Sequence, residues 1–294
     1  MGSLPTGGVA NYNSIMTSQA LLSPESAAQR ESLLADWLRA RGGVAVGFSG
    51  GVDSAYLACL AVEVLGADRV LAIIGISASY PAVQWETARQ VAREFGVPVV
   101  EINTDEIHDS RYAANPTNRC YFCKTELWGR LIPVARSRGF DVVVDGTNAD
   151  DRGDYRPGAR AGQEHEVHSP LAEAGMTKAD IRERSRVRGI PTWKQPSSPC
   201  LSSRLPYGTA VTIERLRQVE VAEEQLRALG VVGDLRVRHH GDLARVEIAV
   251  GELPRWTTPH GVASVDAAVR LAGFSEVVID SRGYRSGSLN VVGA

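Results

Sequence analysis

Two parts of this sequence of 294 residues hold residue types that could do chemistry. The first is the turn at residues 49–54, which reads Ser-Gly-Gly-Val-Asp-Ser and follows an apolar stretch. The second is a set of three cysteines, Cys120, Cys123 and Cys200. Glycine-rich turns before helices bind anions, and thiolates act as nucleophiles or metal ligands. The turn and the cysteines therefore indicate where the function of the chain lies.

The turn at 49–54 joins a predicted buried parallel strand, residues 44–48, to a predicted apolar helix, residues 55–65. Gly50 and Gly51 have no Cβ, so successive backbone N–H groups can point at one anion. The Lys-Ser/Thr pair of a Walker loop and the third glycine of a Rossmann fingerprint are both missing. The turn therefore predicts a phosphate site of another kind, and the alternative is an ordinary glycine-rich connection.

The six residues of this turn resemble the SGGxDS loop of the PP-loop ATP pyrophosphatases. The resemblance implies that the loop binds the β- and γ-phosphates of ATP, that Asp53 helps to hold Mg²⁺, and that pyrophosphate leaves when the α-phosphate is attacked. The residues that it assigns to ATP in this loop are Ser49, Gly50, Gly51, Val52, Asp53 and Ser54.

A second polar loop, Gly146, Thr147 and Asn148, follows a predicted strand at 141–145. It resembles the second nucleotide-facing loop of the same superfamily, and the alternative is a polar turn that caps a helix. Ser77 follows another predicted strand and is a further candidate for ATP binding. Ligands of parallel sheets bind at the carboxyl ends of the strands, where all these residues are expected.

Predicted strands and helices alternate over the first two thirds of the chain, which is typical of an α/β fold with a doubly wound parallel sheet. The strands are expected at 44–48, 69–77, 98–103 and 141–145, and the helices at 23–41, 55–65, 82–95, 127–138 and 168–188. Ser23 and Pro24 are expected to start the first helix, and Thr177 to cap the last one. Lys178 is interpreted as a solvated lysine, with an approach to the phosphates as the alternative.

From about Tyr207 the pattern changes to that of a second, smaller α+β domain. Its expected elements are a helix at 211–229, strands at 234–239 and 244–249, a helix at 263–272 and a strand at 276–279. We therefore predict three parts: a disordered or non-native N-terminus at 1–22, a PP-loop domain of the adenine nucleotide alpha hydrolase-like type at 23–205, and a C-terminal domain at 206–294.

The segments 118–124 (NRCYFCK) and 196–208 (PSSPCLSSRLPYG) resemble those of the LarE family of PP-loop enzymes. The resemblance runs from about Ser23 onward. It implies an ATP-dependent sulfurtransferase that adenylylates a carboxylate of pyridinium-3,5-biscarboxylic acid mononucleotide and replaces it with a thiocarboxylate. The product serves nickel-pincer cofactor synthesis for lactate racemase. The family also implies a homo-oligomer, namely a hexamer.

The source of the sulfur stays open between two mechanisms. In one form of the LarE family, the cysteine that matches Cys200 gives up its own sulfur and becomes dehydroalanine. This chain has the pair Cys120 and Cys123 in addition, and three thiolates suit three corners of a [4Fe–4S] cluster that carries a sulfide on its fourth iron. A redox CxxC pair and a zinc site that includes His108 are the remaining alternatives.

Two arginines and two glutamates of the C-terminal part are further site candidates. Arg236 and Arg238 alternate along a predicted strand, so both point to one face, and guanidinium groups match phosphate geometry. The resemblance implies that this pair receives the phosphate of the mononucleotide, whereas the alternative is two solvated charges. It also places Glu224 and Glu247 where the family has carboxylates that bind a divalent metal.

The composition argues against nucleic acid and membrane partners. The formal net charge is −2, so the basic surplus that an RNA-binding surface requires is missing. The sequence has no long apolar run and no secretory signal, and four cysteines do not suggest a disulfide framework, so a cytoplasmic protein is expected. The alternatives for the function are a tRNA-thiolating PP-loop enzyme and a non-catalytic nucleotide-binding protein.

Overall fold

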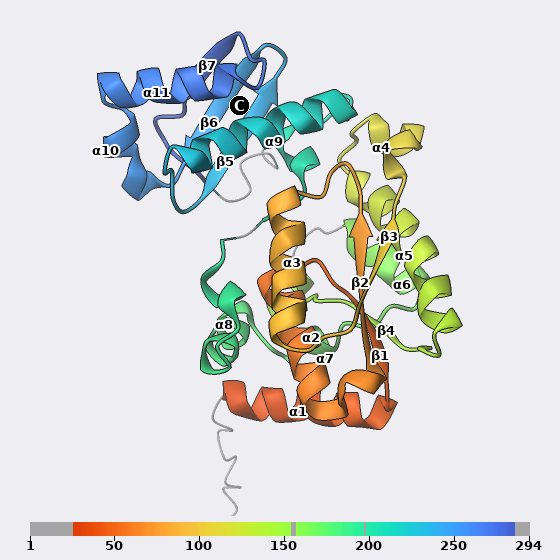
Figure 1. The fold of residues 1–294 in the computed structure, drawn as a ribbon. Helices are drawn as coiled ribbons and strands as arrows, with labels where there is room; N and C mark the ends of the chain where they lie inside the picture. The colour runs from red at the N-terminus through yellow and green to blue at the C-terminus, as the bar shows by residue number, and fades with distance from the viewer. Residues whose placement is uncertain (1–25, 154–156, 197, 286–294) are drawn as a thin grey trace, which may run out of the picture.

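The computed structural model describes residues 26–153, 157–196 and 198–285, and these residues contain two separate β-sheets (Figure 1). The first sheet is parallel, with the strand order β3-β2-β1-β4. Its strands are β1 (Val44–Gly47), β2 (Val70–Ile76), β3 (Val99–Asn103) and β4 (Val143–Val144). The predicted N-terminal segment at 1–22 lies outside the described residues, as do Ser23 and Pro24.

Helices cover both faces of the parallel sheet (Figure 1). The helices α1 (Ala27–Arg41), α2 (Val52–Leu65), α3 (Ala82–Glu94) and α8 (Lys178–Val187) pack in the apolar cluster on one face. The helices α5 (Arg119–Ser137) and α6 (Pro157–Glu164) pack in a second cluster on the other face, around the buried Trp128. The predicted α/β class with a doubly wound sheet is therefore confirmed.

Two predicted helices of this region differ from the structure. The helix α5 begins at Arg119 rather than near Leu127, because the apolar residues of its first turns are adjacent, at 120–123, and so lack the helical spacing of those in its later turns. The predicted helix at 168–188 is two helices, α7 (Pro170–Glu173) and α8, because Gly175 adopts a left-handed φ of 70° between them. Thr177 caps α8 as predicted, through a capping box with Asp180.

The second sheet is small and mixed, with the order β5-β6-β7. The strands β5 (Leu235–His240) and β6 (Leu243–Ile248) form a hairpin, and β7 (Glu276–Ile279) runs parallel to β6. The helices α9 (Ile213–Ala228) and α11 (Pro259–Arg270) supply its apolar cluster, and the short α10 (Leu253–Trp256) lies between β6 and α11 along the chain. A second α+β sheet is thus present as predicted, whereas the boundary at residue 205 stays a prediction.

A separate apolar cluster joins the two sheets. It combines Tyr112 of the short helix α4 (Ser110–Ala113), residues of the segment that follows Cys200, and the first turns of α9. Its buried members are Tyr112, Leu201, Leu205, Val211, Leu216 and Val219. Within the described part of the chain, no helix is both long enough and apolar enough to cross a membrane.

A buried ion network attaches α1 to α8 and gives the first prediction. The carboxylate of Glu31 accepts hydrogen bonds from Tyr56 at 2.6 Å, from Arg184 at 2.8 and 2.9 Å, and from Arg188 at 2.6 and 3.0 Å. Burial raises the pKa of Glu31, but the hydrogen bonds from Arg184, Tyr56 and Arg188 outweigh it and lower the pKa to about 2. The network therefore favours the ionised carboxylate.

We expect Glu31→Gln to lower the free energy of unfolding at pH 7 by about 3 kcal/mol or more, because two arginines lose their buried partner. Since the folded pKa of Glu31 lies below its ordinary value of 4.5, the contribution is complete above pH 4.5 and is lost as the pH falls toward 2. Urea unfolding at pH 7 and pH 3 measures both effects. Glu63→Gln is the matched control, because Glu63 also pairs with Arg188 but its side chain is 55% exposed. An equal cost in both variants would contradict the prediction.

Candidate functional site

The turn at 49–54 passes from β1 into the N-terminus of α2 as predicted, and α2 begins directly after it at Val52. Gly50 has a φ of 67°, and a Cβ at this position would lie 2.6 Å from the Cβ of Ala88 in α3. The Ser54 hydroxyl closes the turn, since it accepts the Ser49 N–H at 3.3 Å and donates to the carbonyl of Gly51 at 3.2 Å. The turn therefore lies at the positive end of a buried helix, a position that suits an anion.

We expect Gly50→Ala to weaken ATP binding by about a hundredfold, because the new Cβ forces both a strained φ and a shift away from α3. Equilibrium titration with ATP and Mg²⁺ measures the loss. Gly42→Ala is the control: Gly42 has a similar φ of 73°, but a Cβ there meets nothing within 4 Å. Unchanged ATP affinity in the Gly50 variant would show that the loop is not the phosphate site.

Asp53 and Lys178 meet at this loop. The Lys178 ammonium group pairs with Oδ2 of Asp53, and the backbone N–H of Lys178 donates to Asp150 at 2.8 Å. The other oxygen of Asp53, Oδ1, is buried and has no hydrogen-bond partner among the described residues. An oxygen of this kind suits Mg²⁺, which prefers carboxylate and phosphate oxygens. Our interpretation of Lys178 as a solvated lysine was wrong, because the start of α8 lies against α2.

The second polar loop lies against the first. A Cβ on Gly146 would be 3.0 Å from the backbone nitrogen of Ser54, so the absence of a side chain allows the contact. The Thr147 hydroxyl donates to Asp145 at 2.8 Å, and Asn148 is buried and accepts the N–H of Asp150 at 3.0 Å. Thr147 and Asn148 thus shape the loop through local hydrogen bonds. Such bonds are typical of a polar turn, which the sequence analysis gave as the alternative to a nucleotide-facing loop.

The segment at 77–80, which follows β2, links the phosphate loop to the cysteines. The Tyr80 hydroxyl donates to the carbonyl of Ser49 at 2.9 Å. The carbonyl of Ser79 accepts the N–H of Leu201, the residue after Cys200, at 2.8 Å. The predicted ATP residue Ser77 lies in this segment, and its hydroxyl is 3.0 Å from that of Ser79. One short segment therefore contacts both halves of the candidate site.

A buried carboxylate that the sequence did not single out lies beside Cys123. Oε1 of Glu106 accepts the Ser79 hydroxyl at 3.2 Å and lies 3.9 Å from the sulfur of Cys123. Oε2 of Glu106 is buried without a hydrogen-bond partner among the described residues. No local motif surrounds Glu106 in the sequence, because its contacts come from the segment after β2 and from α5.

The three cysteines lie in two segments of the chain, and the charge of Cys200 acts on the other two. Cys120 and Cys123 lie in the first two turns of α5, and Cys200 immediately precedes a 3₁₀ turn at Leu201–Arg204. All three are free thiols. Cys120 is exposed when the whole residue is considered, but its thiol group is surrounded by protein. This burial raises the pKa of the Cys120 thiol, and the charge of Cys200 raises it further. Burial and the charges of Glu106 and Cys200 raise the pKa of Cys123.

Hydrogen bonds join the start of α5 to the segment after Cys200. Arg119, which precedes Cys120, donates to the carbonyl of Ser202 at 3.0 Å, and the hydroxyls of Tyr112 and Ser202 are 2.6 Å apart. The buried Asn115 has a left-handed φ of 54°, and its amide donates to the carbonyls of Pro206 and Thr209, both at 2.8 Å. A strained, fully buried Asn is typical of a functional region.

Among the described residues, no three His, Cys, Asp or Glu side chains are arranged as a group that could hold a metal ion. The donor chemistry of three free thiols nevertheless suits iron. The cysteine pair opens a helix, as a redox CxxC does, but α4 and a 3₁₀ turn separate it from β3. His108 is the candidate fourth zinc ligand, and its Nδ1 lies 2.6 Å from Oδ1 of Asp105.

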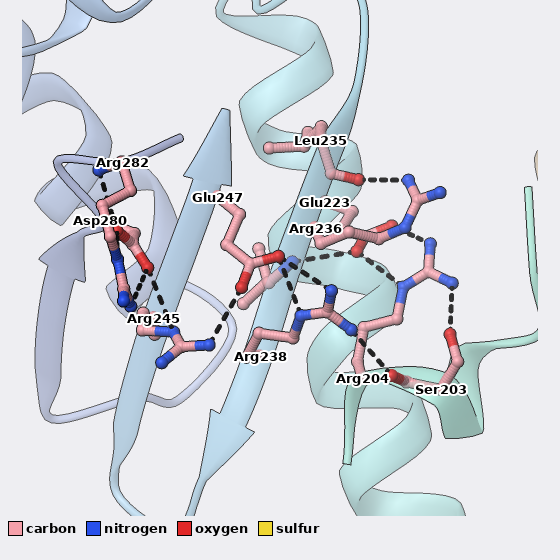
Figure 2. Close-up of polar contacts among 11 residues, drawn as sticks. Ser203, Arg204, Glu223, Leu235, Arg236, Arg238, Arg245, Glu247, Asp280 and Arg282 are labelled. Carbon is pink, nitrogen blue, oxygen red and sulfur yellow. Dashed lines mark hydrogen bonds and ion pairs between the residues drawn. The ribbon is translucent and has the colours of Figure 1, made fainter. Parts of the chain in front are cut away.

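Arg236 and Arg238 are both buried on the same face of β5, so neither is a solvated charge (Figure 2). Arg238 donates to Oε2 of Glu247 at 2.8 and 2.9 Å and to the carbonyl of Ser203 at 2.9 Å. Arg236 lies over the ring of Tyr284 at 5.0 Å and donates to the carbonyl of Leu235 at 2.6 Å. Burial and the nearby positive charges lower the pKa of Arg236, so its surroundings favour an arriving anion.

The two glutamates predicted as metal ligands lie in different surroundings. Glu247 is buried and pairs with Arg238 and with Arg245, the latter at 3.0 Å (Figure 2). Glu224 lies on α9, where burial and the charges of Glu220 and Glu86 raise its pKa. The structure does not place the two in one group of metal ligands among its described residues.

His239 is the last residue of the strand predicted at 234–239, and it lies within β5. It is a buried residue of β5, its ring packs edge-on against Phe274 at 5.2 Å, and its Nε2 lies 3.0 Å from the amide oxygen of Gln218. The hairpin turn begins one residue later than we predicted, and Gly241 provides its left-handed φ of 71°. His239 is therefore part of the core beneath the arginine pair.

Comparison with known proteins gives four further findings. Residues 29–132 match the NAD synthase family. An uncharacterised protein of Synechocystis sp. is 41% identical over 84% of this chain and 91% of its own length. The pyridinium-3,5-bisthiocarboxylic acid mononucleotide synthase of Lactiplantibacillus plantarum is 34% identical over 84% of this chain and 88% of its own length. Among solved structures, the NMN synthetase from Francisella tularensis is similar with a TM-score of 0.48 and 18% identity, over 59% of this chain and 76% of that one.

Proposed function

Since the chain belongs to the LarE family, that of the pyridinium-3,5-bisthiocarboxylic acid mononucleotide synthase, we propose that it is an ATP-dependent sulfurtransferase. Its substrate is pyridinium-3,5-biscarboxylic acid mononucleotide, a carboxylate of which it converts into a thiocarboxylate for nickel-pincer cofactor synthesis. The observation that carries the proposal is the segment 77–80, which contacts the phosphate loop through Tyr80 and the Cys200 segment through Ser79. Activation and sulfur transfer therefore meet at one edge of the sheet.

The first step activates the carboxylate. A carboxylate oxygen attacks the α-phosphorus of ATP, and the bond from this phosphorus to the pyrophosphate oxygen breaks, so that AMP stays on the substrate. The backbone N–H groups of the 49–54 turn bind the β- and γ-phosphates, and Lys178 adds a positive charge beside them. Oδ1 of Asp53 is the oxygen that would hold Mg²⁺, which neutralises the phosphate charge when it is bound.

The second step replaces oxygen with sulfur. A sulfur nucleophile attacks the acyl carbon, a carbon–sulfur bond forms, and AMP leaves with the oxygen of the former carboxylate. If Cys200 supplies the sulfur, a thioester forms first. Loss of the Cα proton and cleavage of the Cβ–S bond then release the thiocarboxylate and leave dehydroalanine at position 200. This route needs no external oxidant or reductant.

We propose that the sulfur comes instead from a [4Fe–4S] cluster held by Cys120, Cys123 and Cys200, which would carry a sulfide on its fourth iron. Free sulfide from solution would replace each sulfide that is transferred, and this would allow repeated turnover. Support comes from the donor chemistry of three free thiols and from the charge of Cys200, which acts on the pKa of the other two. Anaerobic reconstitution with iron and sulfide tests the cluster. Broad absorbance near about 400 nm and bound iron are expected. A colourless, iron-free protein that makes a single thiocarboxylate per chain would favour sacrifice of Cys200.

The resemblance to the LarE family implies the remaining roles, which concern the substrate phosphate, a divalent metal and the assembly. Arg236 and Arg238 would receive the phosphate of the mononucleotide, which requires them to loosen some of their present contacts. To hold a divalent metal together with Glu224, Glu247 would have to leave its ion pairs with Arg238 and Arg245. A homo-hexamer is the expected assembly. Light scattering measures the mass of the assembly, and a monomer would contradict the last of these points.

Pyrophosphate release tests the proposed function against its two alternatives. With ATP and pyridinium-3,5-biscarboxylic acid mononucleotide, we expect release of pyrophosphate that depends on the mononucleotide. Release that depends on tRNA would identify a tRNA-thiolating enzyme, and no release with either substrate would identify a non-catalytic nucleotide-binding protein.

A further inference from the structure

One buried guanidinium group holds the backbone on both sides of Cys200. Arg204 is 2% exposed, and its Nη1 donates to the carbonyl oxygens of Pro199 at 2.6 Å and Cys200 at 3.1 Å. The same nitrogen also donates to the hydroxyl of Ser203 at 3.2 Å. The segment that carries the sulfur site is therefore fixed by the side chain of a residue four positions further along the chain.

The other side of this guanidinium binds the C-terminal part of the protein. Its Nε and Nη2 donate to the two carboxylate oxygens of Glu223 on α9, at 2.9 and 2.8 Å. Oε1 of Glu223 also accepts the backbone N–H of Val237 at 3.0 Å. Val237 stands between Arg236 and Arg238 in β5, so a continuous set of hydrogen bonds joins Cys200 to this strand. Figure 2 shows the part of this set that runs between Arg204 and Glu223.

The geometry of this link makes it rigid. A two-pronged pair between arginine and a carboxylate fixes both distance and angle, which a lysine cannot reproduce. The Arg204 side chain is 3% exposed and that of Glu223 is 17% exposed, so solvent screens the pair little. A second bond, from Arg238 to the carbonyl of Ser203 at 2.9 Å, runs in parallel.

We propose that Arg204 is a positioning residue for sulfur transfer: through Glu223 it sets the place of Cys200 relative to the strand that carries Arg236 and Arg238. The inference rests on the proposed function, in which this strand receives the substrate phosphate and Cys200 marks the source of the sulfur. The side-chain hydrogen bonds of the 49–54 turn go to the turn itself, to Tyr80 and to Lys178, whereas those of Arg204 go to residues 199–203 and to Glu223, so we expect activation by ATP to proceed without the link. Loss of the link should therefore impair sulfur transfer while activation of the carboxylate continues.

The test compares Arg204→Lys and Glu223→Gln with the wild type. We expect pyrophosphate release and the KM for the mononucleotide to change by less than about threefold, while thiocarboxylate formed per pyrophosphate falls by about tenfold or more, because a small displacement of the sulfur source is costly. The two substitutions act on one link. The ratio of thiocarboxylate to pyrophosphate in the double variant should therefore be no lower than in the more impaired of the two single variants.

Arg227→Lys is the control for weakening of the C-terminal part. Arg227 lies on the same helix, but its guanidinium binds the carbonyls of Val231 and Gly233 and makes no hydrogen bond to residues 199–204. This variant should keep the wild-type ratio of thiocarboxylate to pyrophosphate. An unchanged ratio in Arg204→Lys and Glu223→Gln, or an equal fall in Arg227→Lys, would overturn the proposal.

A chemical readout separates this proposal from the function on which it rests. Alkylation of Cys200 by iodoacetamide, followed by peptide mass spectrometry, should be faster in Arg204→Lys than in the wild type, while the buried Cys59 stays unmodified in both. If the wild type releases no pyrophosphate, the proposed function is wrong, and the alkylation rate of Cys200 alone decides whether Arg204 holds this segment. Equal rates would contradict the role of Arg204.

Discussion

Substitution of Cys200 by serine is expected to abolish thiocarboxylate formation while pyrophosphate release continues. Cys200 belongs to the segment that contacts Ser79. Each of the two proposed mechanisms requires it, one as a cluster ligand and the other as the sacrificial sulfur donor. The loss should be on the order of 10³-fold or more, as for the removal of a nucleophile. Pyrophosphate release should stay within about threefold of the wild type, since no atom of Cys200 takes part in the first step. Mass spectrometry of the nucleotide product and a pyrophosphate assay measure the two.

The other cysteines provide the controls for this prediction. Cys59 lies in the apolar core of α2, and Cys59→Ala should keep sulfur transfer. Cys120→Ala and Cys123→Ala distinguish the two sulfur sources. Both variants should lose transfer if a cluster is the donor, and both should keep one thiocarboxylate per chain if Cys200 is sacrificed. Thiocarboxylate formation by Cys200→Ser at the wild-type rate would contradict both mechanisms.

Substitution of Asp53 by asparagine should produce the second large effect, a fall of about 10²- to 10³-fold in pyrophosphate release, because a charged ligand for the metal–phosphate group is lost. The variant keeps the shape of the side chain, but it removes the negative charge that now pairs with Lys178. ATP affinity should become insensitive to Mg²⁺, and titration with ATP at several Mg²⁺ concentrations measures this change.

Asp68→Asn is the matched control for Asp53→Asn. Asp68 is an exposed residue just beyond the opposite end of α2, so the same change of charge is made far from the phosphate loop. It should leave both pyrophosphate release and the dependence on Mg²⁺ unchanged. Wild-type activity in Asp53→Asn would show that this carboxylate is not part of the site.

Local sequence patterns were sufficient to predict the strand–turn–helix geometry around residues 49–54 and the parallel sheet. The 49–54 turn needs only two glycines between an apolar strand and an apolar helix, and all of these are contiguous. The alternation of strands and helices likewise predicted the parallel sheet. The start of α5 at Arg119 was missed, because the apolar residues of its first turns are not at helical spacing and Arg119 is held by a hydrogen bond to the segment after Cys200.

Residues whose role depends on distant contacts could not be predicted. Lys178 reaches Asp53 only because α8 packs on α2, and Glu106 reaches Cys123 only because a 3₁₀ turn after β3 lies beside α5. Arg204 was part of a recognised motif, but its partner Glu223 looked like any glutamate on a charged helix. For such pairs the sequence contains the residue types but no signal that they meet.

The most direct test of the account is the product balance of a single reaction with ATP and pyridinium-3,5-biscarboxylic acid mononucleotide. We predict AMP and pyrophosphate together with a nucleotide in which one carboxylate oxygen has been exchanged for sulfur. ADP and orthophosphate as products, or AMP and pyrophosphate with a nucleotide that never gains sulfur, would contradict the account.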